Sequence, residues 1–176
     1  KETRQFIVGY NTGHKYLDHI RKRIFLTCLS FIHHVLKTNF FVPQKHALAF
    51  RLDPQYLKEL PPDYRSDLPE EFPFRITFFF GRYGAGYHIG FADIARGGWR
   101  TVICRSADSY LTNMNTLFRE VFVLAHTQHL KNKDIYEGGS KMTVVLDAAD
   151  CTSQEEINHR LVKSKVGLLN AFLDIF

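Results

Sequence analysis

Phe74-Arg75-Ile76-Thr77-Phe78-Phe79-Phe80 is the strongest strand signal in the chain, because aromatic and β-branched side chains favour extended backbone. A glycine-rich segment, residues 81–86, follows it and predicts a turn. Residues 87–91 then alternate between apolar and polar or small side chains, as a returning strand does. The fold is therefore expected to be organised around this hairpin.

Helical patterns lie on both sides of the hairpin. Apolar residues recur at three- and four-residue steps over residues 14–37, which predicts a helix buried on more than one side and ended by Asn39 and Pro43. A second helix is expected to begin at a cap, either Asp108 or Ser109, and to end near Lys131-Asn132.

Strands and one more helix complete the pattern. Ser153 and Glu156 have the spacing of a capping box and predict a final helix that runs to the last residues. Because strands and helices alternate, the sequence predicts an α/β fold: a three-layer domain with a mixed β-sheet flanked by helices. The further strands are expected at residues 6–8, 47–52, 101–104 and 142–146.

Composition narrows the class of protein. Of the 176 residues, 45% are hydrophobic and 23% are charged, which is typical of a globular domain and not of a disordered chain. No run of about 18 uncharged apolar residues appears, so no membrane partner is expected. Three widely spaced cysteines, Cys28, Cys104 and Cys151, predict reduced thiols in a cytoplasmic protein, with neither a zinc site nor a disulfide framework.

The first residue is not Met, and no signal-type apolar stretch follows Lys1-Glu2-Thr3-Arg4. We therefore expect residues 1–176 to form a single domain excised from a larger protein. The net charge of +5 is compatible with anionic small molecules as well as with nucleic acid.

Two glycine-rich segments carry cations. Arg96-Gly97-Gly98 lets the backbone approach a ligand, while an arginine captures a carboxylate or phosphate with two parallel hydrogen bonds. Lys141 follows Gly138-Gly139-Ser140 and enters a buried strand, where burial lowers the pKa of a lysine and makes it useful in acid–base catalysis. The plainer interpretations are a turn between surface arginines and a lysine that extends into solvent.

Each of three other features has a plain structural interpretation. Lys131 stands at the expected end of a long helix, where its charge either binds a ligand or complements the helix dipole. His126 and His129 share a helix face, and we interpret them as polar surface residues because no further metal ligand follows at a suitable spacing. Residues 82–91 resemble the RNA-recognition-motif strand, but Tyr83 stands where that motif needs glycine, so nucleic acid is not expected.

In their order and rough spacing, the motifs from Leu52 to Asp147 resemble the large bacterial NAD-specific glutamate dehydrogenases, of the glutamate, leucine, phenylalanine and valine dehydrogenase superfamily. The resemblance implies the fold of the N-terminal domain of amino-acid dehydrogenases, self-association into a homo-oligomer, and oxidative deamination of L-glutamate to 2-oxoglutarate and ammonia by NAD. The motifs that carry it are Leu52-Asp53-Pro54, Pro73-Phe74-Arg75, Gly86-Tyr87-His88, Ile94-Ala95-Arg96-Gly97-Gly98-Trp99-Arg100, Phe118-Arg119-Glu120, Leu130-Lys131-Asn132 and Gly139-Ser140-Lys141.

The resemblance also implies roles for individual residues. Arg96, followed by Gly97 and Gly98, matches the family's cation that holds a substrate carboxylate, and Lys131 matches the lysine that binds the other carboxylate end. Lys141 matches the catalytic lysine that activates the water attacking the imine. No Gly-x-Gly-x-x-Gly follows a strand, so NAD is expected to bind a domain that these 176 residues lack, and the fragment alone is expected to be inactive.

The sequence departs from the family in a longer segment between Trp99 and Phe118 and at two places near Lys141. Met142-Thr143 stand where the family usually has Gly-Gly, and Glu137 precedes the glycines where the family is apolar or has proline. These departures motivate an alternative function, a non-catalytic dicarboxylate-sensing or regulatory domain derived from the same fold.

Overall fold

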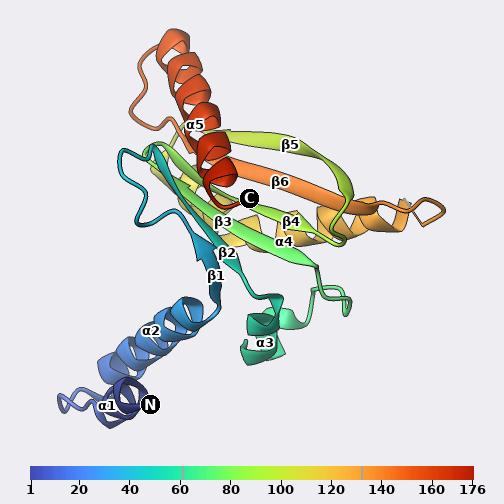
Figure 1. The fold of residues 1–176 in the computed structure, drawn as a ribbon. Helices are drawn as coiled ribbons and strands as arrows, with labels where there is room; N and C mark the ends of the chain where they lie inside the picture. The colour runs from blue at the N-terminus through green and yellow to red at the C-terminus, as the bar shows by residue number, and fades with distance from the viewer. Residues whose placement is uncertain (61, 132) are drawn as a thin grey trace.

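The computed structural model describes residues 1–60, 62–131 and 133–176. Six strands form one sheet in the order β1-β2-β3-β4-β6-β5, in which β5 and β6 run parallel and the other described neighbours are antiparallel. Helices lie against both faces of this mixed sheet (Figure 1), which confirms the predicted α/β fold. The elements are α1 (Glu2–Gly9), α2 (Lys15–His33), β1 (Val35–Thr38), β2 (Ala47–Leu52), the 3-10 helix η1 (Pro54–Glu59), α3 (Pro62–Arg65), β3 (Arg75–Gly81), β4 (Gly84–Gly90), β5 (Ala95–Cys104), α4 (Ala107–Lys131), β6 (Gly138–Asp147) and α5 (Gln154–Asp174).

Two apolar cores lie on opposite faces of the sheet. Val144 and Val145 are adjacent on β6 and both are buried, yet they belong to different cores because successive strand residues point to opposite faces. Val145 packs with Phe122 of α4, and Val144 packs with Leu168 of α5. The three layers are therefore α4, the sheet and α5.

The predicted hairpin is present, but its turn is shorter than expected. Only Arg82 and Tyr83 lie between β3 and β4, and the predicted turn residues 84–86 belong to β4. A Cβ on Gly84 would lie 2.3 Å from the carbonyl oxygen of Val145, and one on Gly86 would lie 2.6 Å from that of Thr143. These glycines therefore allow β6 to approach β4 closely, and they do not mark a turn.

The N-terminal predictions were right for most of one helix and wrong for the strand before it and for the end of that helix. Residues 6–8 belong to the helix α1, and the predicted helix 14–37 ends at His33 because residues 35–38 form β1 and pair with β2. Figure 1 shows α1 and α2 lying away from the sheet, to which β1 joins them. Tyr16 is 76% exposed, so α2 is not buried on several sides; near its end, Phe31 packs edge-to-face on Phe50 at 5.5 Å.

The helix starts were predicted in part. Ser106, and neither Asp108 nor Ser109, caps α4, since its Oγ accepts a hydrogen bond of 3.2 Å from the backbone N–H of Ser109. Ser153 caps α5 as predicted, since its Oγ accepts from the backbone N–H of Glu156 at 3.2 Å. The Glu156 carboxylate in turn accepts from the backbone N–H groups of Thr152 and Ser153.

The remaining boundaries follow the predictions with one extension. The strands predicted at 47–52 and 142–146 are β2 and part of β6, whereas the strand predicted at 101–104 is the second half of a longer β5. Residues 62–65 form the short helix α3, and the described part of α4 extends to Lys131, as predicted, with Asn132 outside the described residues.

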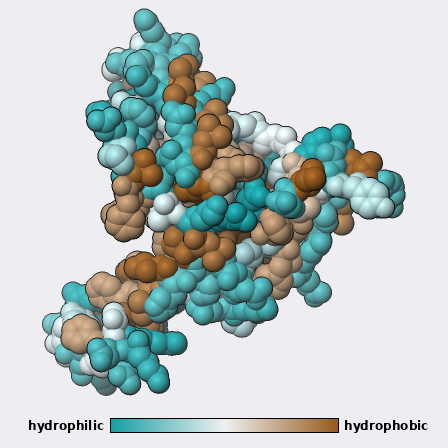
Figure 2. Space-filling view, in the orientation of Figure 1, coloured by the Kyte–Doolittle hydropathy of each residue, from teal (hydrophilic) through white to brown (hydrophobic). Residues whose placement is uncertain are grey.

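Part of the apolar surface stays exposed. Figure 2 shows hydrophobic side chains gathered along α5, where Leu173 is 69% exposed and Phe176 is 73% exposed. Among the described helices, none is both long and apolar enough to cross a membrane.

His88 of β4 makes stability depend on pH. Its ring lies 5.5 Å from that of Phe172, and its buried Nδ1 has no hydrogen-bond partner among the described residues. Burial, with a smaller contribution from the charge of Arg75, lowers the pKa of His88 to about 4 from 6.5.

We expect the free energy of unfolding to fall by about 3 kcal/mol as the pH drops from about 6.5 to about 4, because the unfolded chain then binds a proton that folded His88 does not. Urea unfolding at a series of pH values measures this slope. His88→Phe keeps an aromatic ring beside Phe172 and is expected to lose this part of the slope. An identical slope in both proteins would contradict the assignment.

Candidate functional site

A pocket of about 270 Å³ lies between α4 and the first halves of β5 and β6. The structure brings all five predicted site residues to it: Arg96, Gly97 and Gly98 from β5, Lys131 from α4, and Lys141 from β6. Sequence reasoning missed the other lining residues, which are Leu124, Thr127, Gln128 and Ser140.

The two glycine segments are strands, so the interpretation of Arg96-Gly97-Gly98 as a turn between surface arginines was wrong. Residues 96–98 lie inside β5, residues 138–140 begin β6, and the parallel register places Gly98 beside Lys141. A Cβ on Gly97 would lie 1.9 Å from the carbonyl oxygen of Ser140. Gly97 is therefore required for the strands to pair at this distance.

Gly98 opens the space in front of the lysine. Lys141 is only partly buried. A Cβ on Gly98 would lie 3.8 Å from the Nζ of Lys141, so the bare glycine leaves the volume beside this amine to a ligand.

The backbone of α4 rests directly on β6. A Cβ on Gly139 would lie 1.9 Å from the backbone nitrogen of His129, and the Gly139 N–H donates to the His129 Nδ1 at 3.3 Å. This contact holds the last turns of α4 over the strand that carries Lys141. Three of the missed lining residues could have been found from the sequence. They lie on the same helix face as Lys131, three, four and seven residues before it, at positions 128, 127 and 124.

His126 and His129 support this end of the helix. Both rings pack on Phe91, at 5.2 Å and 5.4 Å between centroids, so they are partly buried and are not simple surface residues. The Glu71 carboxylate lies 3.2 Å from the Nε2 of His126 and 3.4 Å from that of His129. Because the His129 Nδ1 accepts from Gly139, its Nε2 carries the proton that points to Glu71.

Glu71 was missed because it lies in an irregular segment with no periodic pattern. Within the described parts of the chain, no group of three or more histidine, cysteine, aspartate or glutamate side chains is placed to hold a metal ion.

Glu137 takes part in the site through Arg96. Its Oε1 lies 3.3 Å from the Nε of Arg96, and the two side chains are 31% and 59% exposed. An exposed ion pair of this kind contributes about 0–1 kcal/mol, so a competing carboxylate can displace it. A second arginine of β5, Arg100, pairs with Glu120 of α4.

Met142 and Thr143 are both buried, and as neighbours on β6 they face opposite sides of the sheet. Met142 is 8% exposed and packs in the α5 core, and Thr143 is fully buried. Neither lines the pocket. The two residues that replace the usual Gly-Gly therefore leave the surroundings of the Lys141 amine open.

Comparison with known proteins identifies the family. Residues 14–176 match the family described as "Bacterial NAD-glutamate dehydrogenase, catalytic domain". The chain belongs to this NAD-glutamate dehydrogenase family. Similar proteins include glutamate dehydrogenase 2 of Dictyostelium discoideum, 40% identical over 86% of this chain, and the NAD-specific glutamate dehydrogenases of Neurospora crassa, 42% identical over 77%, and Saccharomyces cerevisiae, 45% identical over 64%.

The matched segments cover 14%, 12% and 10% of the lengths of these three relatives. In the described part of the chain, no strand leads through a glycine-rich turn into a helix, which is the arrangement that holds the pyrophosphate of a dinucleotide in doubly wound folds. Gly84, Gly86 and Gly90 all lie within β4. The cationic pocket between α4, β5 and β6 is therefore the candidate functional site of these residues.

Gly139→Ala is expected to destabilise the protein by about 1–3 kcal/mol or more, because the new methyl group collides with the α4 backbone. Gly9→Ala is the matched control, since a Cβ there meets nothing within 4 Å. Thermal unfolding followed by circular dichroism compares the two. Equal midpoints would show that α4 does not rest on β6 as described.

Proposed function

We propose that this chain is the substrate-binding part of an NAD-dependent glutamate dehydrogenase, which oxidatively deaminates L-glutamate to 2-oxoglutarate and ammonia. The observation that carries the proposal is one pocket lined by cations from three different elements: Arg96 of β5, Lys131 of α4 and Lys141 of β6. Membership of the NAD-glutamate dehydrogenase family supports it.

The charge of the pocket suits a dicarboxylate. No acidic side chain is among the described residues that line it, and the nearest one in an ion pair with the lining is Glu137. Arg96 holds one carboxylate, since its planar fork offers two parallel donors, and Lys131 holds the other as a point charge. Gly97 and Gly98 add no side chain to the pocket surface, so the substrate lies against the backbone of β5.

Lys141 performs the proton chemistry in this proposal. It stands beside Gly98, where a bound amino acid would present its α-carbon. When the imine formed by oxidation is hydrolysed, a neutral lysine amine accepts a proton from the attacking water and later returns it to the departing ammonia.

NAD supplies the hydride acceptor when it is bound, and the proposal places its binding in another domain of the longer protein. Residues 1–176 then act as one substrate-binding unit, and the cytoplasmic location stays a prediction. Self-association into a homo-oligomer is also part of the proposal, and the exposed apolar side chains of α2 and α5 support it.

A second candidate function rests on the Arg96–Glu137 ion pair. If Glu137 occupies Arg96 in place of one substrate carboxylate, the pocket still holds an anion but orients it poorly for reaction. The chain would then be a non-catalytic dicarboxylate sensor or regulatory domain.

Lys141→Ala in the full-length protein is expected to lower kcat for NAD-dependent glutamate oxidation by roughly 10²- to 10⁴-fold, the usual contribution of a general acid–base. Lys131→Ala is expected to raise KM more than it lowers kcat, because it removes binding. Lys133→Ala, an exposed lysine outside the pocket lining, is the control and is expected to keep wild-type kinetics.

Steady-state kinetics with NADH absorbance as the readout checks these three variants. Wild-type turnover in Lys141→Ala would remove the catalytic assignment. If the wild-type protein binds 2-oxoglutarate but does not oxidise glutamate, the sensor function replaces the enzyme function.

Glu137→Gln is expected to tighten 2-oxoglutarate binding by up to about fivefold, because the substrate no longer competes with a carboxylate for Arg96. Asp134→Asn removes the same charge from the same exposed segment outside the pocket lining, so it reports the long-range effect alone. Isothermal titration calorimetry measures both. Equal changes in the two variants would show that Glu137 does not compete for Arg96.

A further inference from the structure

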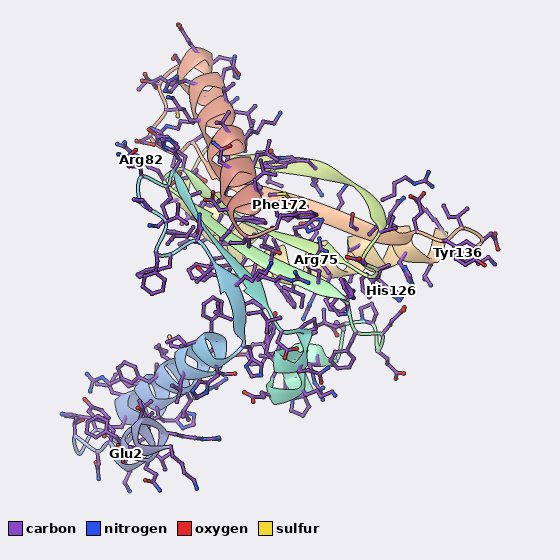
Figure 3. The ribbon with its side chains drawn as sticks, in the orientation of Figure 1. Glu2, Arg75, Arg82, His126, Tyr136 and Phe172 are labelled. Carbon is purple, nitrogen blue, oxygen red and sulfur yellow. The ribbon has the colours of Figure 1, made fainter. Side chains whose placement is uncertain are left out.

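A second pocket, of about 390 Å³, lies at the other end of the sheet and on its α5 face. It is formed where the β3–β4 turn and the start of β2 meet the middle of α5. Figure 3 shows Arg82 beside α5, at the end of the sheet opposite His126 and Tyr136. The described lining residues are His46, Ala47, Gly81, Arg82, Tyr83, His159, Lys163, Ser164, Val166, Gly167 and Leu168.

The charged side chains among the described lining residues of this pocket are all basic. Arg82 and Lys163 are permanent cations at neutral pH, His46 and His159 add two imidazoles, and no acidic side chain is among the described lining residues. His159 and Lys163 are four residues apart on α5 and therefore share a helix face. Cations that converge without a carboxylate repel one another unless an anion joins them.

One acidic group near the lining residue Tyr83 is engaged by an arginine outside the lining. Asp150 binds Arg160 through two hydrogen bonds, of 2.5 and 2.9 Å. Arg160 in turn lies over the Tyr83 ring at 5.0 Å, and Arg82 lies over the same ring at 5.3 Å. The aromatic ring thus holds the Arg82 guanidinium beside the pocket without neutralising its charge.

Small residues keep the pocket hollow. A Cβ on Gly167 would lie 3.4 Å from the Cβ of His46, and one on Gly81 would lie 3.6 Å from the side chain of Leu168. Larger residues at these two positions would fill the space between α5 and the strands. The resulting volume is within the range of small-molecule sites, which begins at about 300 Å³.

We propose that this pocket binds the phosphate group of a small molecule, at a site separate from the dicarboxylate pocket. Arg82 offers a planar pair of donors, Lys163 a point charge and Ser164 a hydroxyl, which together match the three acceptor oxygens of a phosphate. The ligand is either free inorganic phosphate or a phosphate monoester whose organic part contacts Tyr83 and Val166. The proposal does not depend on the function proposed above, because it concerns other residues and a different ligand.

The test is calorimetric titration of the full-length protein with glucose 6-phosphate, inorganic phosphate and glucose. Glucose 6-phosphate or phosphate is expected to bind saturably, glucose is not, and excess 2-oxoglutarate should not displace the bound phosphate compound. Tighter binding of the ester than of phosphate identifies an organic phosphate as the ligand, and equal binding identifies free phosphate; both results support the site.

Arg82→Gln and Lys163→Gln are each expected to weaken this binding by about tenfold, the usual effect of losing one charge-assisted hydrogen bond. Lys165→Gln is the matched control, since it removes the same charge from an exposed position of α5 outside the lining, and a change below about twofold is expected. Unchanged thermal midpoints confirm that all three variants fold. Absence of saturable binding of both phosphate compounds at concentrations up to about 10 mM, or equal weakening in Lys165→Gln, would overturn the proposal.

Discussion

The contact between the backbone of α4 and the first residues of β6 is the constraint on which the rest of the structure depends. Gly138 and Gly139 have no space for a side chain: a Cβ on the first would lie 2.6 Å from the Cβ of Ala92, and one on the second 1.9 Å from the nitrogen of His129. With ordinary residues there, the helix would stand further from the sheet. Lys131 and Lys141 would then no longer share one small pocket.

The same contact explains why an aromatic core continues into a polar site along one helix. Phe118 and Phe122 of α4 pack on Tyr87 and Phe91, and one turn later His126 and His129 pack on Phe91 as well. The histidines replace apolar rings where the core approaches solvent, because a ring nitrogen can bind Glu71 or the backbone of Gly139 while the ring face stays packed. The lining residues are thus presented by a rigid element.

Sequence reasoning succeeded where one local signal dominates. The aromatic run of β3, the end of the described part of α4 at Lys131 and the capping serine of α5 are local features, and the five chosen site residues do line one pocket. It failed where the decisive contact comes from a distant part of the chain. Gly84 and Gly86 of β4 were assigned to a turn, and a turn was the plainer interpretation of the β5 glycines, because only the neighbouring strand shows why a Cβ is excluded.

The exposure of α2 could not be foreseen for a related reason. Its apolar spacing is that of a buried helix, but spacing does not tell whether another surface covers it, and Tyr16, Ile24 and Ile32 remain exposed in these 176 residues. Glu71 and Glu137 were missed as site partners because an ion pair between segments leaves no periodic pattern. The sequence thus predicts which residues have the chemistry, whereas the fold decides their partners.

The position of the candidate site on the sheet also explains its composition. β5, α4 and β6 form a unit with two parallel strands, and ligands of such units commonly bind beyond the carboxyl ends of the strands, near the amino end of the helix. Here the pocket lies at the opposite edge, by the amino-terminal halves of β5 and β6 and the carboxyl end of α4. The helix dipole is negative there and repels an anion. Backbone N–H groups of the helix cannot hold a carboxylate in this position, so the attraction has to come from side chains. The three cations Arg96, Lys131 and Lys141 supply this attraction. Removing any one of them leaves less positive charge to offset the negative end of the α4 dipole.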